Sequence, residues 1–378
     1  MQIGFDSTPL LGQRSGVGQY TNCLLTHLSQ SRPDWQFDLY SNRPLNGALN
    51  DSLNGGRPNA QQIDGHFPRS RLYWMHMVLP GVIRKNRPDL CHFPNNSAPL
   101  HCPAPYVITI HDVSLFRYSQ YHPRSRLLAL RLLLPVVARR AAAVITVSRH
   151  ARQELIHVLK IPPDKIHVIH EAPPTHIRPV TDPAALARIQ RKYRLPRQFI
   201  LYVGTIEPRK NLRRLVRAVG QLHQNGRHPH LILVGPNGWL MNGSLEKEIE
   251  QCGLTNYVRY LGYVPQADLA GIYSQATLFA FPSLYEGFGL PPLEAMACGL
   301  PVLTSRASSM AEVCQSAAYL VDPQDESDIA AGLDRLLTQP TLRADLRQKG
   351  LHRVQSFSWQ RVAAETAVVY QKVLEHDE

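Results

Sequence analysis

The chain has 378 residues, a length that suggests two domains, each large enough to bury its own core. Its 44% hydrophobic share is ordinary for a globular protein and excludes a disordered chain. The charge is unusual, because 41 Lys and Arg residues against 29 Asp and Glu residues leave a formal net charge of +12.

The basic excess lies in the first half of the chain. Residues 1–180 hold 20 basic and 10 acidic residues, a net +10, whereas residues 181–378 hold 21 and 19, a net +2. A one-sided basic field suggests nucleic acid, an anionic membrane surface or a strongly acidic ligand as the partner. The basic half lacks the interleaved aromatic residues of an RNA-binding signature, so we expect no nucleic acid.

The termini and cysteines indicate a cytoplasmic protein. The sequence opens on a strand-like MQIGFD with no signal-peptide pattern, and its six irregularly spaced cysteines fit reduced thiols. The most apolar window, 127–147, contains Arg131, Arg139 and Arg140, each of which costs about 2.5 kcal/mol or more at a bilayer centre. We therefore expect no spanning helix. Peripheral association with the inner face of the cytoplasmic membrane stays open.

Taken in chain order, short apolar runs alternate with helical stretches. The expected strands cover residues 2–6, 36–40, 89–93, 106–110, 143–148, 198–204, 230–235, 257–262, 277–283 and 301–305. Such alternation predicts parallel sheets built from βαβ units, and the proline-rich segment 171–186 reads as a linker. The fold class is therefore α/β, with two Rossmann-like doubly wound domains and a cleft between them. Ligands of such sheets bind outside the carboxyl ends of the strands.

The loop after the first strand contains Gly16-Val17-Gly18, ahead of a stretch, 20–28, that we expect to be helical. Glycines there let backbone N–H groups and a positive helix end approach an anion closely. The match to a dinucleotide motif is poor, since Thr21 stands where a third glycine is needed, and this disfavours an oxidoreductase. A plain flexible loop is the alternative.

A second loop, GTIEPRKN at 204–211, precedes a helix and places Arg209 and Lys210 near the helix start. Cations are unfavourable at that end of the helix dipole, so another benefit is required. A bound diphosphate would supply it, taking the planar donor of Arg209 and the point charge of Lys210. A solvated basic turn is the alternative.

A third loop, EGFGLPPLEAMA, places Glu286 in a loop and Glu294 one to two turns into a helix. Glu286 could accept hydrogen bonds from a polyhydroxylated ligand and Glu294 from a ribose. The N–H groups of residues 288–290 would lie at the positive helix end and face the phosphates between. The alternative is a helix N-terminus with favourable acidic residues.

His111 ends the strand 106–110, where open sheets place their ligands, so a functional and a purely structural histidine are about equally favoured. Ser148, which precedes a helical stretch, is interpreted as an N-cap.

These loops, in this order and over essentially the whole chain, resemble the retaining glycosyltransferases of family 4, which have the GT-B fold. The most specific parts are the Glu286–Glu294 pair, the GTIEPRKN run, HDVS at His111 and TVS at Ser148. The resemblance implies an acceptor-binding domain, residues 1–175 with 362–378, and a donor-binding domain, residues 176–361. The last helix would cross back to the first domain.

The resemblance also implies residue roles. Arg209 and Lys210 match the pair that holds the donor diphosphate. Glu294 matches the ribose-binding carboxylate, Glu286 the group that grips the transferred sugar, and His111 the histidine beside the reaction centre. The other implied donor-binding positions are Gly16, Gly18, Gly204, Tyr263, Val264, Phe288, Gly289 and Leu290, with Tyr263 and Val264 at the nucleobase.

One position departs from the family pattern, because Thr205 stands where many members carry a second arginine. The GTxEPRKN form resembles mannosyltransferases of bacterial surface-polysaccharide assembly, which suggests GDP-mannose as the donor. The implied acceptor is a lipid-diphosphate-linked or oligosaccharide chain. A nucleotide-sugar epimerase or hydrolase of the same fold, and a non-catalytic nucleotide-sugar-binding protein, are the alternatives.

We expect no metal and no cofactor. The charge of the leaving group must be neutralised either by a metal on an Asp-x-Asp site or by fixed cations. The sequence has no Asp-x-Asp and has Arg209-Lys210, which favours a metal-independent mechanism with front-face attack and retention. No residue stands out as a covalent nucleophile. Cys91-His92 and His101-Cys102 flank a Pro/Asn loop, but adjacent ligands point apart, which disfavours zinc.

The segment 122–140 carries Arg124, Arg131 and Arg139 among leucines, and Pro135 is expected to kink or divide it. One interpretation is a core helix with a solvated arginine face. The other is an interfacial patch for anionic lipid headgroups, which would suit a lipid-linked acceptor.

Overall fold

The computed structural model describes residues 1–11, 16–45, 59–63, 70–121, 124–238 and 243–375. The chain divides into two compact units. One contains residues 1–116, 125–171 and 358–378, and the other contains residues 117–124 and 172–357. We expected the boundaries at 175 and 361, slightly further along the chain. The last helix belongs to the first unit, as predicted.

The first unit is built on a seven-stranded sheet whose pairings are all parallel in the described residues. In spatial order its strands are β3 (Ala60–Gln62), β2 (Gln36–Tyr40), β1 (Gln2–Asp6), β4 (Leu90–Phe93), β5 (Tyr106–Ile110), β6 (Ala143–Thr146) and β7 (Ile166–Val168). The order reverses between β1 and β4, the switch point of a doubly wound sheet.

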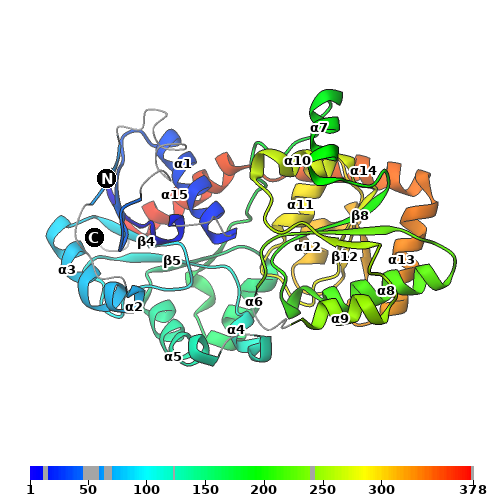
Figure 1. Ribbon diagram of the computed structural model, residues 1–378. Helices are drawn as coiled ribbons and strands as arrows, with labels where there is room; N and C mark the ends of the chain where they lie inside the picture. The colour runs from blue at the N-terminus through cyan, green and yellow to red at the C-terminus, as the bar shows by residue number, and fades with distance from the viewer. Residues whose placement is uncertain (12–15, 46–58, 64–69, 122–123, 239–242, 376–378) are drawn as a thin grey trace. The chain divides into compact units, whose positions relative to one another are not determined.

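Helices cover both faces of this sheet. One layer contains α1 (Gly16–Ser31) and the C-terminal α15 (Trp359–Glu375), which lie side by side (Figure 1). A second core contains residues of α3 (Leu79–Asn86), α5 (Arg124–Arg140) and α6 (Arg149–Leu159). Shorter segments complete the unit: α2 (Arg71–Tyr73), a π-helical turn (Trp74–Val78) and α4 (Ser114–Arg117).

The second unit repeats the plan with six parallel strands. Their order is β10 (Val258–Tyr260), β9 (His230–Val234), β8 (Phe199–Val203), β11 (Leu278–Phe281), β12 (Val302–Ser305) and β13 (Tyr319–Val321). The switch point lies between β8 and β11. Both sheets confirm the predicted pair of Rossmann-like domains.

In the second unit the helices also form two layers around the sheet (Figure 1). One layer contains α8 (Leu212–Gln224), α9 (Ser244–Gln251) and α13 (Glu326–Thr338), and the other contains α10 (Gln266–Gln275), α11 (Leu290–Ala297) and α14 (Pro340–Val354). Helices α7 (Pro183–Tyr193) and α12 (Met310–Cys314) complete the unit. In α8 the buried Leu212, Leu215, Val216, Val219 and Leu222 recur at helical spacing and form its core-facing stripe.

Three strands were missed by the sequence analysis: β3, β7 and β13. Each has three residues and is an edge strand of its sheet. Strands this short carry too few residues to show an alternating or continuously apolar pattern.

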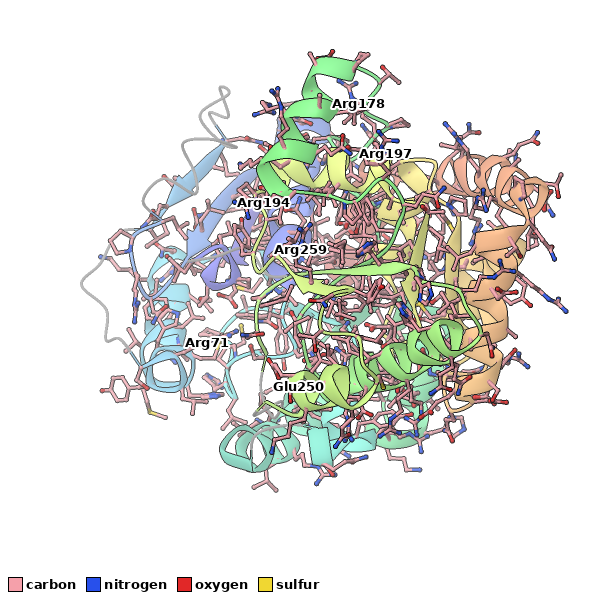
Figure 2. The ribbon with its side chains drawn as sticks, turned by 45° about the vertical axis from the view of Figure 1, so that its right-hand side comes forward. Arg71, Arg178, Arg194, Arg197, Glu250 and Arg259 are labelled. Atoms are coloured by element: carbon pink, nitrogen blue, oxygen red, sulfur yellow. The ribbon has the colours of Figure 1, made fainter. Side chains whose placement is uncertain are left out.

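Although the second half of the sequence is nearly neutral, arginines gather at one edge of the second unit. Arg178, Arg194 and Arg197 are exposed there, close to α7 and to Arg259 on β10 (Figure 2). The Arg259 guanidinium donates to the carbonyls of Tyr193 and Arg194 at 2.8 and 2.7 Å.

Candidate functional site

The loops that follow β8 and β11 lie at the switch point of the second sheet, where doubly wound folds bind ligands. They are joined by a backbone hydrogen bond, since the Leu284 N–H donates to the Arg209 carbonyl at 3.0 Å. The Asn211 amide donates to the Pro282 carbonyl at 2.9 Å, and Asn211 itself adopts a left-handed φ of 64°. Two segments far apart in sequence therefore form one rigid platform.

The predicted basic pair lies on this platform and contacts two carboxylates. Lys210 Nζ is 2.7 Å from Glu286 Oε1, and Arg209 Nη1 is 3.1 Å from Glu286 Oε2. Arg209 Nη2 is 2.6 Å from Glu207 Oε1. Two cations thus face two carboxylates, and the cluster is compensated within the protein. Our argument that a bound diphosphate is needed to offset the cations was wrong, because Glu207 and Glu286 already do so.

Glu286 is buried and ionised. Burial by itself raises the pKa of this carboxyl, but Lys210 and Arg209, together with a 2.6 Å hydrogen bond from Ser283, hold the pKa below its ordinary value. A carboxylate held in this way keeps its partners fixed, and a ligand phosphate reaching Lys210 or Arg209 competes with it for the same donors.

Glu294 lies in a different environment, although only one helix turn separates it from the start of α11. Burial raises the pKa of the Glu294 carboxyl to about 6, even though Tyr273 Oη donates a hydrogen bond to it at 2.9 Å. Among the described residues of the second unit, no cation lies beside the Glu294 carboxylate, which is mostly ionised near neutral pH. It is therefore able to accept hydrogen bonds from ligand hydroxyls.

The start of α11 is shaped by Gly289, its N-cap, whose φ is 115°. A Cβ at this position would come within 2.2 Å of the flexible end of the Met310 side chain, and the positive φ strains any residue that has a side chain. Ser309 Oγ donates to the carbonyls of Glu286 and Phe288 and fixes the approach to the helix. Because α11 begins at Leu290, the N–H groups of Gly289 and Leu290 lie in its first turn, where no intrahelical acceptor exists.

Three further predicted donor positions follow other strands or strand ends of the same sheet. Gly204 directly follows β8 with a φ of 154°, and a Cβ there would be 2.8 Å from the Tyr202 hydroxyl. Tyr263 and Val264 follow β10, the first side chain exposed and the second buried. An exposed ring beside a buried aliphatic residue is compatible with stacking on a nucleobase.

In the first unit, His111 comes directly after β5, as predicted, and both its ring nitrogens are bonded. Nδ1 donates to Glu171 at 2.9 Å and Nε2 to the Pro94 carbonyl at 2.9 Å. Burial lowers the pKa of His111, but the Glu171 carboxylate and the Pro94 carbonyl outweigh burial and raise the pKa above its ordinary value. His111 is thus paired with a buried carboxylate that favours its protonated form.

A second histidine lies behind it in the core. His92 bonds the hydroxyls of Tyr370 on α15, at 2.5 Å, and Thr109 on β5, at 2.8 Å. Burial and the charge of His111 lower the pKa of His92 to about 3. The neutral His92 therefore ties the C-terminal helix to the sheet, whereas His111 lies at the carboxyl end of β5.

Glu171, Glu207 and Tyr273 were not identified by the sequence analysis. Glu207 could have been predicted from the sequence, because it lies in the same GTIEPRKN run as the basic pair. Glu171 lies in the proline-rich linker and Tyr273 lies in an ordinary helical stretch, so no local sequence pattern marked either residue as part of a site.

The other predicted positions of the first unit are only partly described. Gly16 begins α1 and is exposed, whereas Gly18 is buried within the helix; residues 12–15 of the loop before them lie outside the described residues. Of the two expected effects of Pro135, a kink or a division, the division does not occur, because helix α5 runs continuously through this residue. Arg131 and Arg139 are exposed on it, and the Arg124 side chain lies outside the description.

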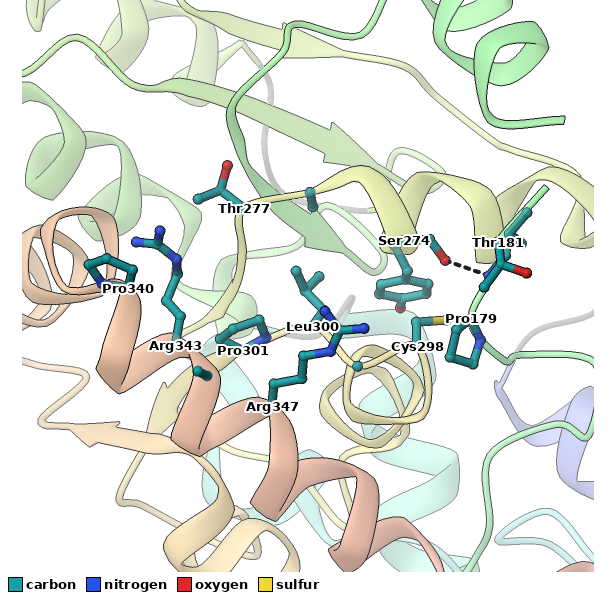
Figure 3. Close-up of a pocket in the computed structure, with 15 residues that line it drawn as sticks. Pro179, Thr181, Ser274, Thr277, Cys298, Leu300, Pro301, Pro340, Arg343 and Arg347 are labelled. Carbon is teal, nitrogen blue, oxygen red and sulfur yellow. Dashed lines mark hydrogen bonds between the residues drawn. The ribbon is translucent and has the colours of Figure 1, made fainter. Parts of the chain in front are cut away.

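Two other features bear on the site. In the second unit a pocket of about 430 Å³ is lined by Arg343, Arg347 and Cys298–Pro301 (Figure 3). It lies beside the residues that precede β11 and β12, at the edge of the sheet opposite to the platform, and contains no predicted site residue. Across the described ranges, no three His, Cys, Asp or Glu side chains are grouped so that they could hold a metal ion.

The fold and the platform together define the GT-B class of two-domain proteins. Sucrose-phosphate synthase from Thermosynechococcus elongatus superposes with a TM-score of 0.78 at 21% identity, covering 99% of both chains. HepE from Anabaena, in complex with UDP and glucose, superposes with a TM-score of 0.76 at 19% identity, covering 97% of this chain and 98% of that one.

The sequence comparisons identify the family. Residues 14–172 match the model described as Glycosyltransferase Family 4, and residues 187–353 match Glycosyl transferases group 1. The chain is 36% identical to O-antigen chain mannosyltransferase B of Escherichia coli, over 98% of this chain and 99% of the relative. It is 33% identical to the MMP alpha-(1->4)-mannosyltransferase of Mycolicibacterium hassiacum, over 63% and 56% of the two chains. The protein belongs to the group 1, family 4 glycosyltransferases.

Proposed function

We propose that this glycosyltransferase moves mannose from GDP-mannose, with retention of the anomeric configuration, onto a lipid-linked or oligosaccharide acceptor of bacterial surface-polysaccharide synthesis. The observation that carries the proposal is the Arg209–Lys210–Glu286 cluster at the switch point of the second sheet, with Glu294 on the adjoining helix. The names of the Escherichia coli and Mycolicibacterium relatives support the choice of mannose.

The cluster suits departure of a nucleoside diphosphate. Arg209 and Lys210 are fixed cations, and preorganised charges of this kind stabilise a leaving group without reorganisation. When the diphosphate accepts hydrogen bonds from Arg209 and Lys210 in place of Glu286, the Glu286 carboxylate becomes able to accept hydrogen bonds from the hydroxyls of the transferred sugar. The sequence contains no Asp-x-Asp, so we propose that these side chains do the work that a metal does elsewhere.

We assign the remaining contacts to the nucleotide-sugar donor from the positions of the predicted residues in the second unit. Glu294 would accept from the ribose hydroxyls, Tyr263 and Val264 would hold the base, and the amides at the start of α11 would face the phosphates. We propose that His111, which is held in place by Glu171 and the Pro94 carbonyl, lies beside the reaction centre. With no covalent nucleophile assigned, attack from the face of the leaving diphosphate accounts for retention.

We also propose a peripheral membrane association of the first unit. Among the described residues, no helix is both long and apolar enough to cross a bilayer. Arg131 and Arg139 are exposed on α5, together with Arg124 in sequence, and would meet anionic headgroups.

The test is a screen of nucleotide sugars for thermal stabilisation, followed by transfer assays with the best binder. We expect GDP-mannose to stabilise the protein more than UDP-sugars, and the product to retain the donor's α configuration by NMR. A preference for a UDP-sugar contradicts the donor. Release of free sugar, or of an epimer, without transfer to any acceptor contradicts the reaction and favours the epimerase or hydrolase alternative.

A further inference from the structure

The pocket of about 430 Å³ in the second unit takes no part in the proposed transfer reaction. It lies between the segment 179–181, the end of α10, the end of α11 and the first turns of α14 (Figure 3). The segment 179–181 is a fixed wall, because the Val180 N–H donates to Ser274 Oγ on α10 at 3.0 Å. A volume of this size is in the range of small-molecule sites.

Two arginines of α14 give the pocket its charge. Arg347 extends from the helix toward Cys298, and Arg343 extends toward Thr277 (Figure 3). Arg343 Nη1 donates to two carbonyls in the last turn of α13, at 2.6 and 2.9 Å, which hold the side chain in place. None of the described lining residues is an Asp or Glu. The positive charge of the pocket is therefore not compensated within it.

Gly299 makes room for the second of these arginines. Its φ is 70°, and a Cβ at this position would lie 3.1 Å from Arg347 Nε. The guanidinium therefore lies close to the backbone at the end of α11. Among the described residues Arg347 has no hydrogen bond or ion pair, whereas Arg213 and Arg217 of the same unit share Glu248. A placed guanidinium without a carboxylate is a planar donor suited to phosphate.

Hydroxyl groups line the side of the pocket that faces α14. Thr181 and Thr277 lie there (Figure 3). Thr277 Oγ1 accepts from the Phe199 N–H at 3.2 Å, which leaves its O–H available as a donor. Threonine hydroxyls both donate to and accept from the hydroxyls of a ligand. Arginines on one side and hydroxyls on the other fit a phosphate group attached to a small polyol.

Tyr273 and Cys298 form a wall that this pocket shares with Glu294. Tyr273 Oη donates to the Glu294 carboxylate at 2.9 Å, and the Cys298 N–H donates to the Glu294 backbone carbonyl at 3.1 Å. Burial and the charge of Glu294 raise the pKa of the Cys298 thiol to about 12, so the field of the carboxylate reaches this wall. An anion in the pocket would repel the ionised form of Glu294.

We infer that this pocket is an effector site for a phosphate monoester of a small polyol, and that its occupation weakens binding of the nucleotide-sugar donor. Arg343 and Arg347 bind the phosphate, and the threonine hydroxyls bind the polyol. The effect on the donor rests on the proposed function, because it acts through Glu294 as the ribose-binding carboxylate. Coupling between two sites is reciprocal, so the donor weakens binding of the phosphate monoester by the same factor.

The test uses mannose 6-phosphate as the probe, titrated calorimetrically into the full chain with and without GDP. We expect it to bind at least about tenfold more tightly than mannose or inorganic phosphate, because only it contacts both the arginines and the hydroxyls. Saturating GDP should weaken this binding about fivefold and no further, a limit that indicates two separate sites. Complete displacement by GDP would place the probe in the donor site and overturn the inference, as would equal binding of inorganic phosphate.

Two variants on α14 locate the site. Arg347→Ala should weaken binding of the probe at least about tenfold, and the core is left intact because Arg347 is exposed. Ala344→Glu, at an exposed lining position, places a carboxylate beside the arginines and should abolish detectable binding. The matched control is Lys349→Ala, at an exposed cation of the same helix that is paired with Asp345 at 2.6 Å and does not line the pocket. Unchanged binding by both Arg347→Ala and Ala344→Glu would overturn the inference.

The effector role has its own measurement. Saturating mannose 6-phosphate should raise the Kd of GDP about fivefold in the wild type. Glu294→Gln removes the repelled charge, so this variant should still bind the probe but lose the effect on GDP. A Kd of GDP that does not change when the probe is bound would overturn the inference. If the probe binds and weakens GDP as expected but GDP-mannose supports no transfer, the proposed function fails while the effector site stands.

Discussion

The two units handle positive charge in opposite ways. In the second unit, Arg209 and Lys210 are buried or nearly so and are matched by Glu207 and Glu286 at 2.6–3.1 Å. In the first unit, arginines lie exposed on two helical segments that contain no acidic residue. A compensated cluster holds its geometry in the absence of ligand, whereas uncompensated cations attract an anionic partner over distance. Under the proposed function, the net +10 of the first half serves recognition of an anionic partner, and the cluster of the second unit serves the transfer chemistry.

The largest effect is expected when one cation is removed from the cluster of Arg209, Lys210, Glu207 and Glu286 in the second unit. Lys210→Ala should lower kcat at least about a hundredfold, the usual loss when an electrostatic stabiliser of a leaving group is deleted. Arg213→Ala, at an exposed arginine of α8 that is paired with Glu248 of α9, is the matched control and should keep kcat within about twofold. Near-normal turnover in a folded Lys210→Ala protein contradicts the role assigned to the cluster.

The second carboxylate gives a pH-dependent test of the same platform. Because the pKa of Glu294 is about 6, a ribose that donates to its ionised form should bind less tightly as the pH falls below 6. We expect the KM for the donor to rise about tenfold between pH 7 and pH 5. Glu294→Gln should raise KM at pH 7 and flatten this profile. A variant that keeps the wild-type pH profile would show that another group titrates.

Stability of the first unit should depend on pH through His92. Its pKa is about 3 when folded and 6.5 when unfolded, so the unfolded chain binds more protons between these values and stability falls as the pH drops below 6.5. The loss at pH 5 is about 2 kcal/mol. His111 has the opposite sign, since its raised pKa leaves its contribution complete below 6.5 and lost at higher pH. Urea unfolding of the wild type and His92→Gln at pH 7 and pH 5 should differ in slope with pH; parallel behaviour contradicts the assignment.

The smallest expected effect concerns the exposed arginines of the first unit. Each of Arg131→Gln and Arg139→Gln should weaken sedimentation with anionic vesicles about fivefold at low salt, since one cation near the surface contributes about 1 kcal/mol. Arg361→Gln, at an exposed arginine of α15 that is paired with Glu365, is the control. Binding that is absent in the wild type, or insensitive to both substitutions, removes membrane association from the account.

Features with local sequence signals were predictable. The strand-loop-helix motifs, the Ser148 cap, whose hydroxyl accepts from Ala151 N at 3.0 Å, and the return of the last helix all followed from pattern or family resemblance. The pairing of Arg209 with Glu207 and Glu286 did not, because it depends on the distance between two loops 76 residues apart in the Lys210–Glu286 case.

The contacts of His111 and His92 in the first unit could not be predicted either, because they also join residues far apart in sequence. The Glu171 partner of His111 lies 60 residues away, and the His92–Tyr370 bond joins residues 278 apart. A sequence pattern reports periodicity and turn chemistry over a few residues, whereas these contacts are created by the sheet order.

The central proposal is that Arg209 and Lys210 stabilise the departing diphosphate while mannose moves from GDP-mannose to a lipid-linked acceptor without help from a metal. The most direct measurement is transfer of labelled mannose from GDP-mannose to a synthetic lipid-diphosphate-linked oligosaccharide by the purified chain, with EDTA present. The account predicts an α-linked product formed at an undiminished rate in EDTA and faster than with the same oligosaccharide lacking its lipid. No transfer from GDP-mannose, or transfer abolished by EDTA and restored by a divalent cation, would contradict it.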